Sequence, residues 1–100
     1  MKTRTIKKIT IFNGRNTKVK VEILDGTYWA EGEGRAHCAD GDDFDEETGE
    51  EIAEIRARLK AFDNLIKIYE NVIQGKKNDI KYLQQDKKNL QKRLDYLIED

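Results

Sequence analysis

The feature that most constrains this chain is a repeat of large apolar residues through its second half. Apolar side chains recur at alternating steps of three and four residues, in one phase, from residue 52 to residue 97. This 3.5-residue period is the pattern of an α-helical coiled coil. We call the apolar residues of the repeat the heptad stripe: Ile52, Ile55, Leu59, Phe62, Ile66, Tyr69, Ile73, Ile80, Leu83, Leu90, Leu94 and Leu97.

The heptad stripe predicts one long helix that forms a dimer. Its a positions are mostly isoleucine and its late d positions are leucine, a combination that favours a parallel two-stranded coil. Only Lys76 and Lys87 interrupt the series, and a lysine at position a also favours dimers. The residues expected to mediate oligomerisation are Ile66, Tyr69, Ile73, Ile80, Leu83, Leu90, Leu94 and Leu97.

A break at Gly75 is the alternative for this half of the chain. Gly75 would end one helix, and Asn78 or Asp79 would begin the next, giving a helical hairpin. The chain contains no proline, so no residue forces such a break. The phase of the repeat is the same on both sides of Gly75, which favours a continuous helix.

The first third of the chain has the alternation of β-strands. Residues 4–12 are rich in isoleucine and threonine, and residues 17–24 place Val19, Val21 and Ile23 on one face. Between them, Asn13-Gly14 predicts a hairpin in which both of these residues are central and have positive φ.

A third strand is expected after the Asp25-Gly26 turn signal, beginning in residues 27–30. The glycines at 32 and 34 predict a bulge or loop in the segment that follows. Ala36 and Cys38 would then share the inner face of the sheet. Tyr28 and Trp29 are expected in the core, because this small sheet has few other large residues.

A small sheet of this kind needs a cover, and the helix is the available one. Asp45 is the expected N-cap, with Thr48 as a competing cap. The sequence therefore predicts an α+β fold. An antiparallel β-meander of three or four strands occupies residues 1–45, and a long helix or coiled coil occupies residues 46–100, with its first half packing on the sheet.

The acidic run from Asp40 to Glu47 holds six carboxylates in eight positions. Neither possible register fits an EF-hand loop, and His37 and Cys38 lack further ligands for zinc. We expect no metal, no cofactor and no catalytic residues. The run is instead a candidate partner-binding ridge that could imitate nucleic-acid phosphates, carried by Asp40, Asp42, Asp43, Glu46 and Glu47. Solvation and helix capping are its plainer interpretation.

A basic amino-terminal region supports the alternative of nucleic-acid binding. Residues 1–38 carry eight Lys or Arg against four Asp or Glu, and aromatic residues lie nearby, as in proteins that hold single strands. The candidate contacts are Lys7, Lys8, Arg15, Lys18 and Lys20. The net charge of −1 argues against this function.

Residues 18–60 resemble a family of small accessory proteins of phages and prophages of Gram-positive bacteria. The shared pattern is G.A.C...D.FD...G..IA..RA, which this chain matches at Gly34, Ala36, Cys38, Asp42 or Asp43, Phe44, Asp45, Gly49, Ile52, Ala53, Arg56 and Ala57. Two features depart from it: the loop TYWAEGEG is longer, and Asp-Gly follows the cysteine where His-Pro is common. The resemblance implies a phage accessory context and no known reaction.

The sequence therefore predicts a non-enzymatic protein that acts by protein–protein interaction. The resemblance implies a host or anti-phage defence protein as the partner, with inhibition as the outcome, while a scaffolding role of the coil is a further alternative. A single cysteine and the lack of an apolar span predict a protein of the cytoplasm, the host's if it is phage-encoded, without membrane contact.

Overall fold

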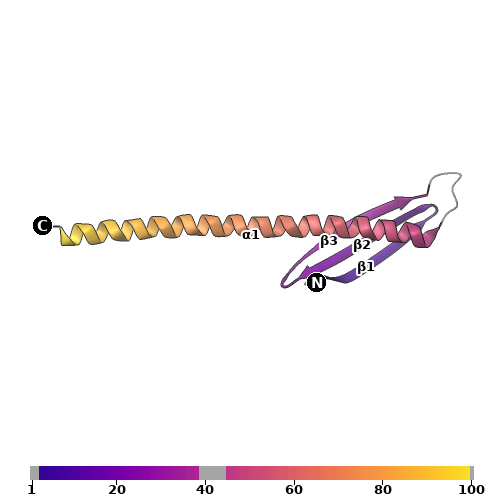
Figure 1. Cartoon of the computed structure of the whole chain (residues 1–100), viewed down its shortest axis with the longest axis horizontal. Coiled ribbons are helices and arrows are strands. Elements are labelled where there is room, and N and C mark those ends of the chain that lie inside the picture. Colours follow the sequence, from indigo (N-terminus) through magenta and orange to yellow (C-terminus); the bar gives the residue numbers. More distant parts are fainter. Residues whose placement is uncertain (1–2, 39–44, 100) are drawn as a thin grey trace. The chain divides into compact units, whose positions relative to one another are not determined.

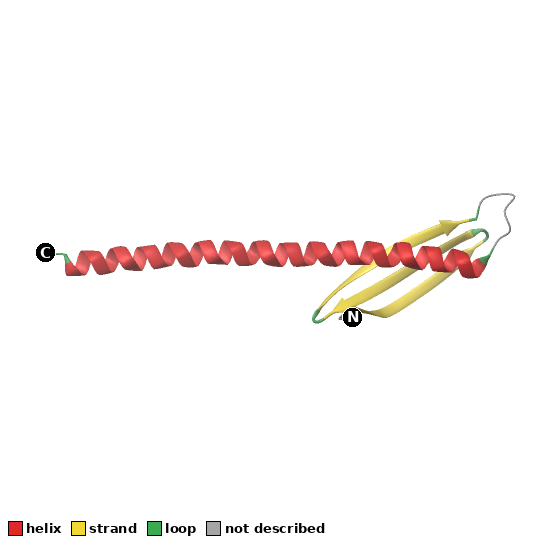
Figure 2. Cartoon of the chain, viewed as in Figure 1, coloured by secondary structure: helices red, strands yellow, loops and turns green. Residues whose placement is uncertain are grey.

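The computed structural model describes residues 3–38 and 45–99. Three strands precede one helix: β1 Thr3–Asn13, β2 Asn16–Asp25, β3 Tyr28–His37 and α1 Glu46–Ile98 (Figures 1 and 2). The strands form an antiparallel sheet in the order β1-β2-β3, and the predicted α+β architecture is confirmed. The helix continues through Gly75, so the helical hairpin is wrong. The coiled coil remains a prediction.

Two compact units divide the chain, residues 1–68 and residues 69–100. The first contains the sheet and the beginning of α1, and the second consists of the remainder of the helix. The sheet and the residues that α1 packs against it therefore belong to one folded body.

Both hairpin turns use glycine as the first of two loop residues. Asn13 pairs with Asn16 and Asp25 with Tyr28, so the loops are Gly14-Arg15 and Gly26-Thr27. Both glycines have φ of 61°, and none of the described non-glycine residues has positive φ. This corrects the predicted first turn: Asn13 precedes the loop. A turn with glycine in its first position, as in type II′, requires positive φ there only.

The core lies on the face of the sheet that α1 covers (Figure 1). Val19, Val21 and Ile23 of β2 are at most 1% exposed, as their alternation predicts. Burying each of these side chains contributes about 1.5–3 kcal/mol. The helix contributes Ala53, Ala57, Ala61 and Leu65, all of which are buried.

β3 is one continuous strand in which the glycines face the helix. A Cβ atom added to Gly34 would collide with the main chain of Ala53 and Ala57, and one added to Gly32 with that of Ala57 and Ala61. The predicted bulge or loop is therefore wrong: β3 pairs with β2 without interruption. The glycines serve a close approach of two backbones, which needs no special φ.

The spacing of small residues explains how the two backbones fit together. Four residues of helix rise about 6 Å, and two residues of strand rise about 6.7 Å. The step from Ala53 to Ala57 thus matches the step from Gly34 to Gly32. Gly49, one turn before Ala53, approaches β2, where its added Cβ would lie 3.3 Å from Thr17 Oγ1.

Two side chains of α1 also bind the backbone of the edge strand β3. Arg56 Nη1 donates to the carbonyl of Arg35, and Asn64 Nδ2 donates to the carbonyl of Glu31, both at 2.7 Å. β1, at the other edge, carries Lys7 and Lys8, charges that discourage edge-to-edge pairing.

Asp45 caps the first turn of α1, as predicted. Its Oδ1 accepts hydrogen bonds from the backbone N–H of Glu47 (3.1 Å) and of Thr48 (3.3 Å). The Thr48 hydroxyl donates to Asp45 Oδ2 at 2.7 Å. Thr48 is therefore a partner of the cap, and its competing role as the cap residue is wrong.

Acidification is expected to weaken this cap. Hydrogen bonds from the Thr48 hydroxyl, then from the Thr48 and Glu47 N–H groups, lower the pKa of Asp45 below its ordinary value. A carboxyl with a lowered folded-state pKa contributes stability above its unfolded pKa and loses it as pH falls through the folded one. Amide protection in the first turn of α1 should therefore decline below about pH 4, measured by hydrogen exchange.

The matched control is Asp45→Asn, which keeps an oxygen acceptor but does not titrate in this range. Its first turn should show a smaller change over the same pH interval. An equal change in the variant and the wild type would contradict the assignment to Asp45.

Candidate functional site

The candidate site is the heptad stripe, which lies on a different face of α1 from the residues that pack on the sheet. With Ile52 at position a, the buried alanines Ala53, Ala57 and Ala61 fall at positions b, f and c. In a two-stranded coil these positions face away from the partner helix. The helix therefore has one face of small residues against the sheet and another of large apolar residues.

The large side chains of this stripe remain exposed beside the sheet. Ile55 is 51% exposed, Leu59 60% and Ile66 54%, and Phe62 is half-buried. Single exposed apolar residues are ordinary, but a contiguous row of them marks an interaction surface. In the folded unit of residues 1–68, packing on the sheet thus leaves the stripe open.

The later stripe residues are exposed as well. Of the residues expected to mediate oligomerisation, Tyr69 is half-buried and the other seven are exposed: Ile66, Ile73, Ile80, Leu83, Leu90, Leu94 and Leu97. Leu83, Leu90 and Leu94 line a shallow groove along the helix. A groove lined by leucines suits the insertion of apolar side chains from a second helix.

Two lysines interrupt the stripe at positions that the repeat assigns to the interface. Lys76 is at position d, and its Nζ lies 3.9 Å from Asp79 Oδ2. Lys87 is at position a, directly after Asp86. Charged residues inside the apolar interface of a coiled coil reduce its stability but select the number of helices and their register.

The described part of the acidic run continues along the first turns of the helix. Glu46 and Glu47 are exposed, whereas Asp40, Asp42, Asp43 and Phe44 lie outside the described residues. Five glutamates and an aromatic ring line one surface hollow: Phe12, Glu46, Glu47, Glu50, Glu51 and Glu54. The acidic surface is therefore broader than the run itself, because the helical period adds three glutamates to it.

The basic candidate residues do not form one cationic surface. Lys8 faces the helix, where its Nζ lies 2.7 Å from Glu50 Oε1 and 3.3 Å from Glu54 Oε1. The hydrogen bond to Glu50 is the main reason that the pKa of Lys8 is raised. Arg15 Nη1 donates to Cys38 Sγ at 3.1 Å.

On the opposite face of the sheet, cross-strand carboxylates accompany the lysines. Lys18 Nζ lies 3.2 Å from Glu33, and Lys20 Nζ lies 3.8 Å from Glu31. Lys7 is paired in register with Glu22. Cations with carboxylate neighbours are poorer phosphate ligands, so this arrangement does not favour the nucleic-acid alternative.

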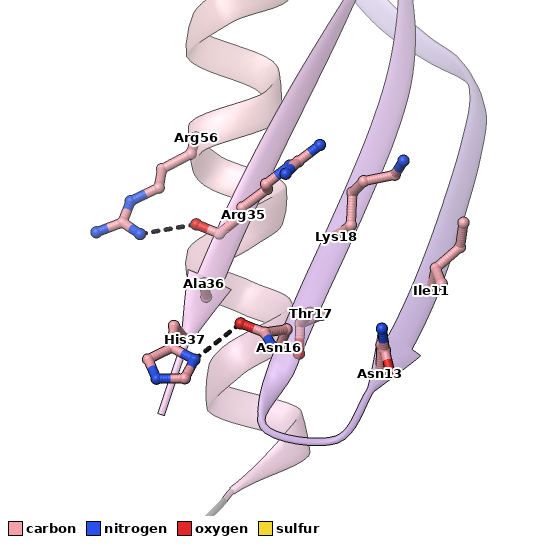
Figure 3. A pocket seen from close by; sticks show the side chains of 9 residues that line it. All are labelled: Ile11, Asn13, Asn16, Thr17, Lys18, Arg35, Ala36, His37 and Arg56. Atoms are coloured by element: carbon pink, nitrogen blue, oxygen red, sulfur yellow. Dashed lines mark hydrogen bonds between the residues drawn. The ribbon is translucent and has the colours of Figure 1, made fainter. Parts of the chain in front are cut away.

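A polar hollow at one end of the sheet is lined by Arg35, His37 and Arg56 in addition to Lys18 (Figure 3). Its dashed contacts join Arg56 to the Arg35 carbonyl, and His37 Nδ1 to Asn16 Oδ1 at 2.8 Å. Arg35 also pairs with Glu33 at 3.3 Å. These contacts all lie within the chain, and the His37 side chain is exposed.

Two predictions about large residues on β3 are wrong. Trp29 is 52% exposed and Tyr28 38% exposed. Trp29 pairs with Leu24 in register, on the sheet face away from α1, because the helix-facing positions of β3 are Ala30, Gly32 and Gly34. Cys38 is half-buried, in part as expected for a small inner-face residue.

The sequence reasoning missed the face of small residues. Its signal was present as alanine or glycine at every second position from 30 to 36 and at every fourth position from 49 to 61. These two periods are those of a strand and a helix that share one interface. Attention to large apolar residues conceals such a pattern.

In residues 3–38 and 45–99, no three side chains among His, Cys, Asp and Glu come together as metal ligands. Within the same ranges, no helix combines the length and apolar character needed to cross a membrane. Comparisons of the chain with protein-family models, with curated proteins and with solved structures gave no match.

Proposed function

We propose that this chain is a non-enzymatic protein that acts by protein–protein interaction, and that its first partner is a second copy of itself. The observation that carries the proposal is the division of α1 into two faces. The sheet packs on Ala53, Ala57 and Ala61, while the heptad stripe on the other face stays exposed. A second helix with the same stripe would bury these side chains.

The length of the stripe supports a stable association. Its twelve apolar residues extend over seven heptads, more than the three or four that mark a sustained coiled-coil pattern. Burial of a leucine or isoleucine side chain contributes about 1.5–3 kcal/mol. Such contributions exceed the cost of association even with lysine at two interface positions.

The test is the mass of the full chain in solution, measured by sedimentation equilibrium over a range of concentrations. A dimer of the 11.7 kDa chain is expected, with dissociation only on dilution. A monomer at all concentrations up to about 100 μM would overturn the proposal, because a stripe of this length should bind far more tightly.

The resemblance to phage accessory proteins supports a second partner, a host or anti-phage defence protein that the dimer would inhibit. The acidic surface around Phe12 is the proposed contact, because its glutamates complement a basic partner. The described members of the predicted ridge, Glu46 and Glu47, belong to it.

Charge reversal of Glu46 and Glu47 is expected to remove this second interaction. A host-cell pull-down with Glu46→Lys/Glu47→Lys should lose a protein that the wild type retains, because like charges then oppose a basic partner. Lys88→Glu/Lys92→Glu, on the second unit, is the matched control and should retain it. Loss with both variants, or with neither, would contradict the assignment of the acidic surface.

A further inference from the structure

We infer that the two copies associate in parallel and in register, so that both β-sheets lie at the same end of the coil and on its outer sides. This inference rests on the proposed self-association and adds its orientation. Three observations support it: the position of the sheet on α1, the charges beside the heptad stripe, and the placement of the interface lysines.

The position of the sheet permits this arrangement. The helix residues that contact the sheet occupy positions b, f and c, with Leu65 at position g. A parallel partner approaches the a and d positions, on the other side of the helix. The sheet of each copy therefore lies behind its own helix, and the two sheets do not compete for the space between the helices.

The flanking charges favour the parallel register. In a parallel pair, each g residue lies beside the e residue of the following heptad in the partner. Glu51 then meets Arg56 of the second copy, and Arg58 meets Asp63 of the second copy. By symmetry each contact occurs twice, and none of the other g–e pairs of the stripe joins like charges.

Arg56 can make its contact without leaving the sheet. Its Nη1 donates to the Arg35 carbonyl, whereas a guanidinium group offers five N–H donors. The remaining donors can bind Glu51 of the second copy. The same residue would thus join the helix to its own sheet and to its partner.

An antiparallel pair is less favourable by the same criterion. In an antiparallel pair whose stripes overlap over their full length, g residues lie beside g residues and e residues beside e residues. Arg58 then meets Arg93 of the second copy. The favourable contact of Glu70 with Lys77 of the second copy offsets this repulsion. The antiparallel pair therefore gains no net attraction at these positions, whereas the parallel pair gains two kinds of contact.

The two lysines in the heptad repeat, Lys76 and Lys87, are compatible with a coil of two parallel helices. Lys87 at position a would lie across from Lys87 of the second copy, with Asp86 of the second copy at the adjacent g position. Lys76 already lies 3.9 Å from Asp79 in its own helix. A lysine at an a position is a feature that selects dimers over larger bundles.

The experiment is cysteine cross-linking of the full chain in a Cys38→Ser background. Leu59→Cys and Leu90→Cys proteins are mixed, unfolded, refolded together and oxidised, and the disulfides are identified by mass spectrometry. A parallel, in-register coil gives 59–59 and 90–90 disulfides, because each residue faces the same residue of the second copy. Lys92→Cys, on the outer f position, is the control and should remain reduced.

The other outcomes separate the two proposals. A dimer that forms 59–90 disulfides between copies, or none at these positions, overturns the parallel register and leaves self-association intact. A chain that sediments as a monomer before oxidation overturns the proposed function itself.

A charge exchange provides a second measurement that needs no cysteine. Arg58→Glu or Asp63→Arg alone places like charges together and should weaken the dimer about tenfold. Arg58→Glu/Asp63→Arg restores opposite charges and should recover most of that loss. Purely additive effects would overturn the parallel register, because only that arrangement brings the two residues together.

Discussion

Replacing Gly34 by valine is expected to disrupt the packing of α1 on the sheet. A side chain at this position meets the main chain of Ala53 and Ala57, and backbone in a helix cannot rotate away as a flexible side chain can. Overpacking usually costs about 1–3 kcal/mol, and a collision with backbone should reach at least the upper end. That is a large part of the stability of a small domain.

The measurement is hydrogen exchange of the β2 amides at Val19, Val21 and Ile23, because these residues form the core. The protection of these amides should fall strongly in Gly34→Val, while the protection of the helical amides in residues 69–100 changes little. Exchange is preferable to overall unfolding, since the chain consists of two units and does not qualify as a two-state system.

Gly75→Ala is the matched control because an added Cβ there meets nothing within 4 Å. Alanine is favoured over glycine inside a helix by about 1 kcal/mol, so this variant should become more helical. Unchanged protection of the β2 amides in Gly34→Val would contradict the close approach of α1 to β3.

Replacing Ile73 by aspartate is expected to dissociate the proposed dimer. Ile73 is 55% exposed in the single chain and occupies position a of the repeat. In a parallel dimer the Ile73 side chains of both copies would be buried between the two helices. Losing two buried isoleucines costs about 3–6 kcal/mol, and two facing carboxylates add repulsion. The dissociation constant should rise by about two to four orders of magnitude, as measured by sedimentation equilibrium.

Asn71→Asp introduces the same carboxylate at the outer f position and is the control. It should leave the mass unchanged, and both variants should keep the protection of the β2 amides, because neither residue belongs to the unit of the sheet. If Ile73→Asp remains a dimer of wild-type affinity, the stripe is not the surface that holds the copies together.

The sequence was sufficient for elements whose periods are visible in large side chains. The alternation of Val19, Val21 and Ile23 predicted β2 and its inner face, and the 3.5-residue period predicted a helix that continues through Gly75. The first inference succeeds because burial of large apolar groups dominates the choice of secondary structure in β2, and the second because the repeat keeps one helical phase on both sides of Gly75.

Other features could not be predicted because they depend on the separation of two backbones. The sequence reasoning assigned Trp29 to the core, since a large residue usually fills space there. Here α1 approaches β3 so closely that glycine and alanine fill the interface, and Trp29 lies on the other face. The helix–strand distance is a tertiary property that neither segment reveals alone.

The face of small residues has a consequence for how α1 is located along the sheet. Small residues recur at each turn from Gly49 to Ala61, so steric fit sets the separation of the layers but resists translation weakly. Displacement by four residues, about 6 Å, that brings Gly49 and Ala53 opposite Gly34 would again place small residues opposite both glycines. The directional hydrogen bonds of Arg56 and Asn64 to β3 therefore determine the position of α1 along the sheet, which close packing alone does not define.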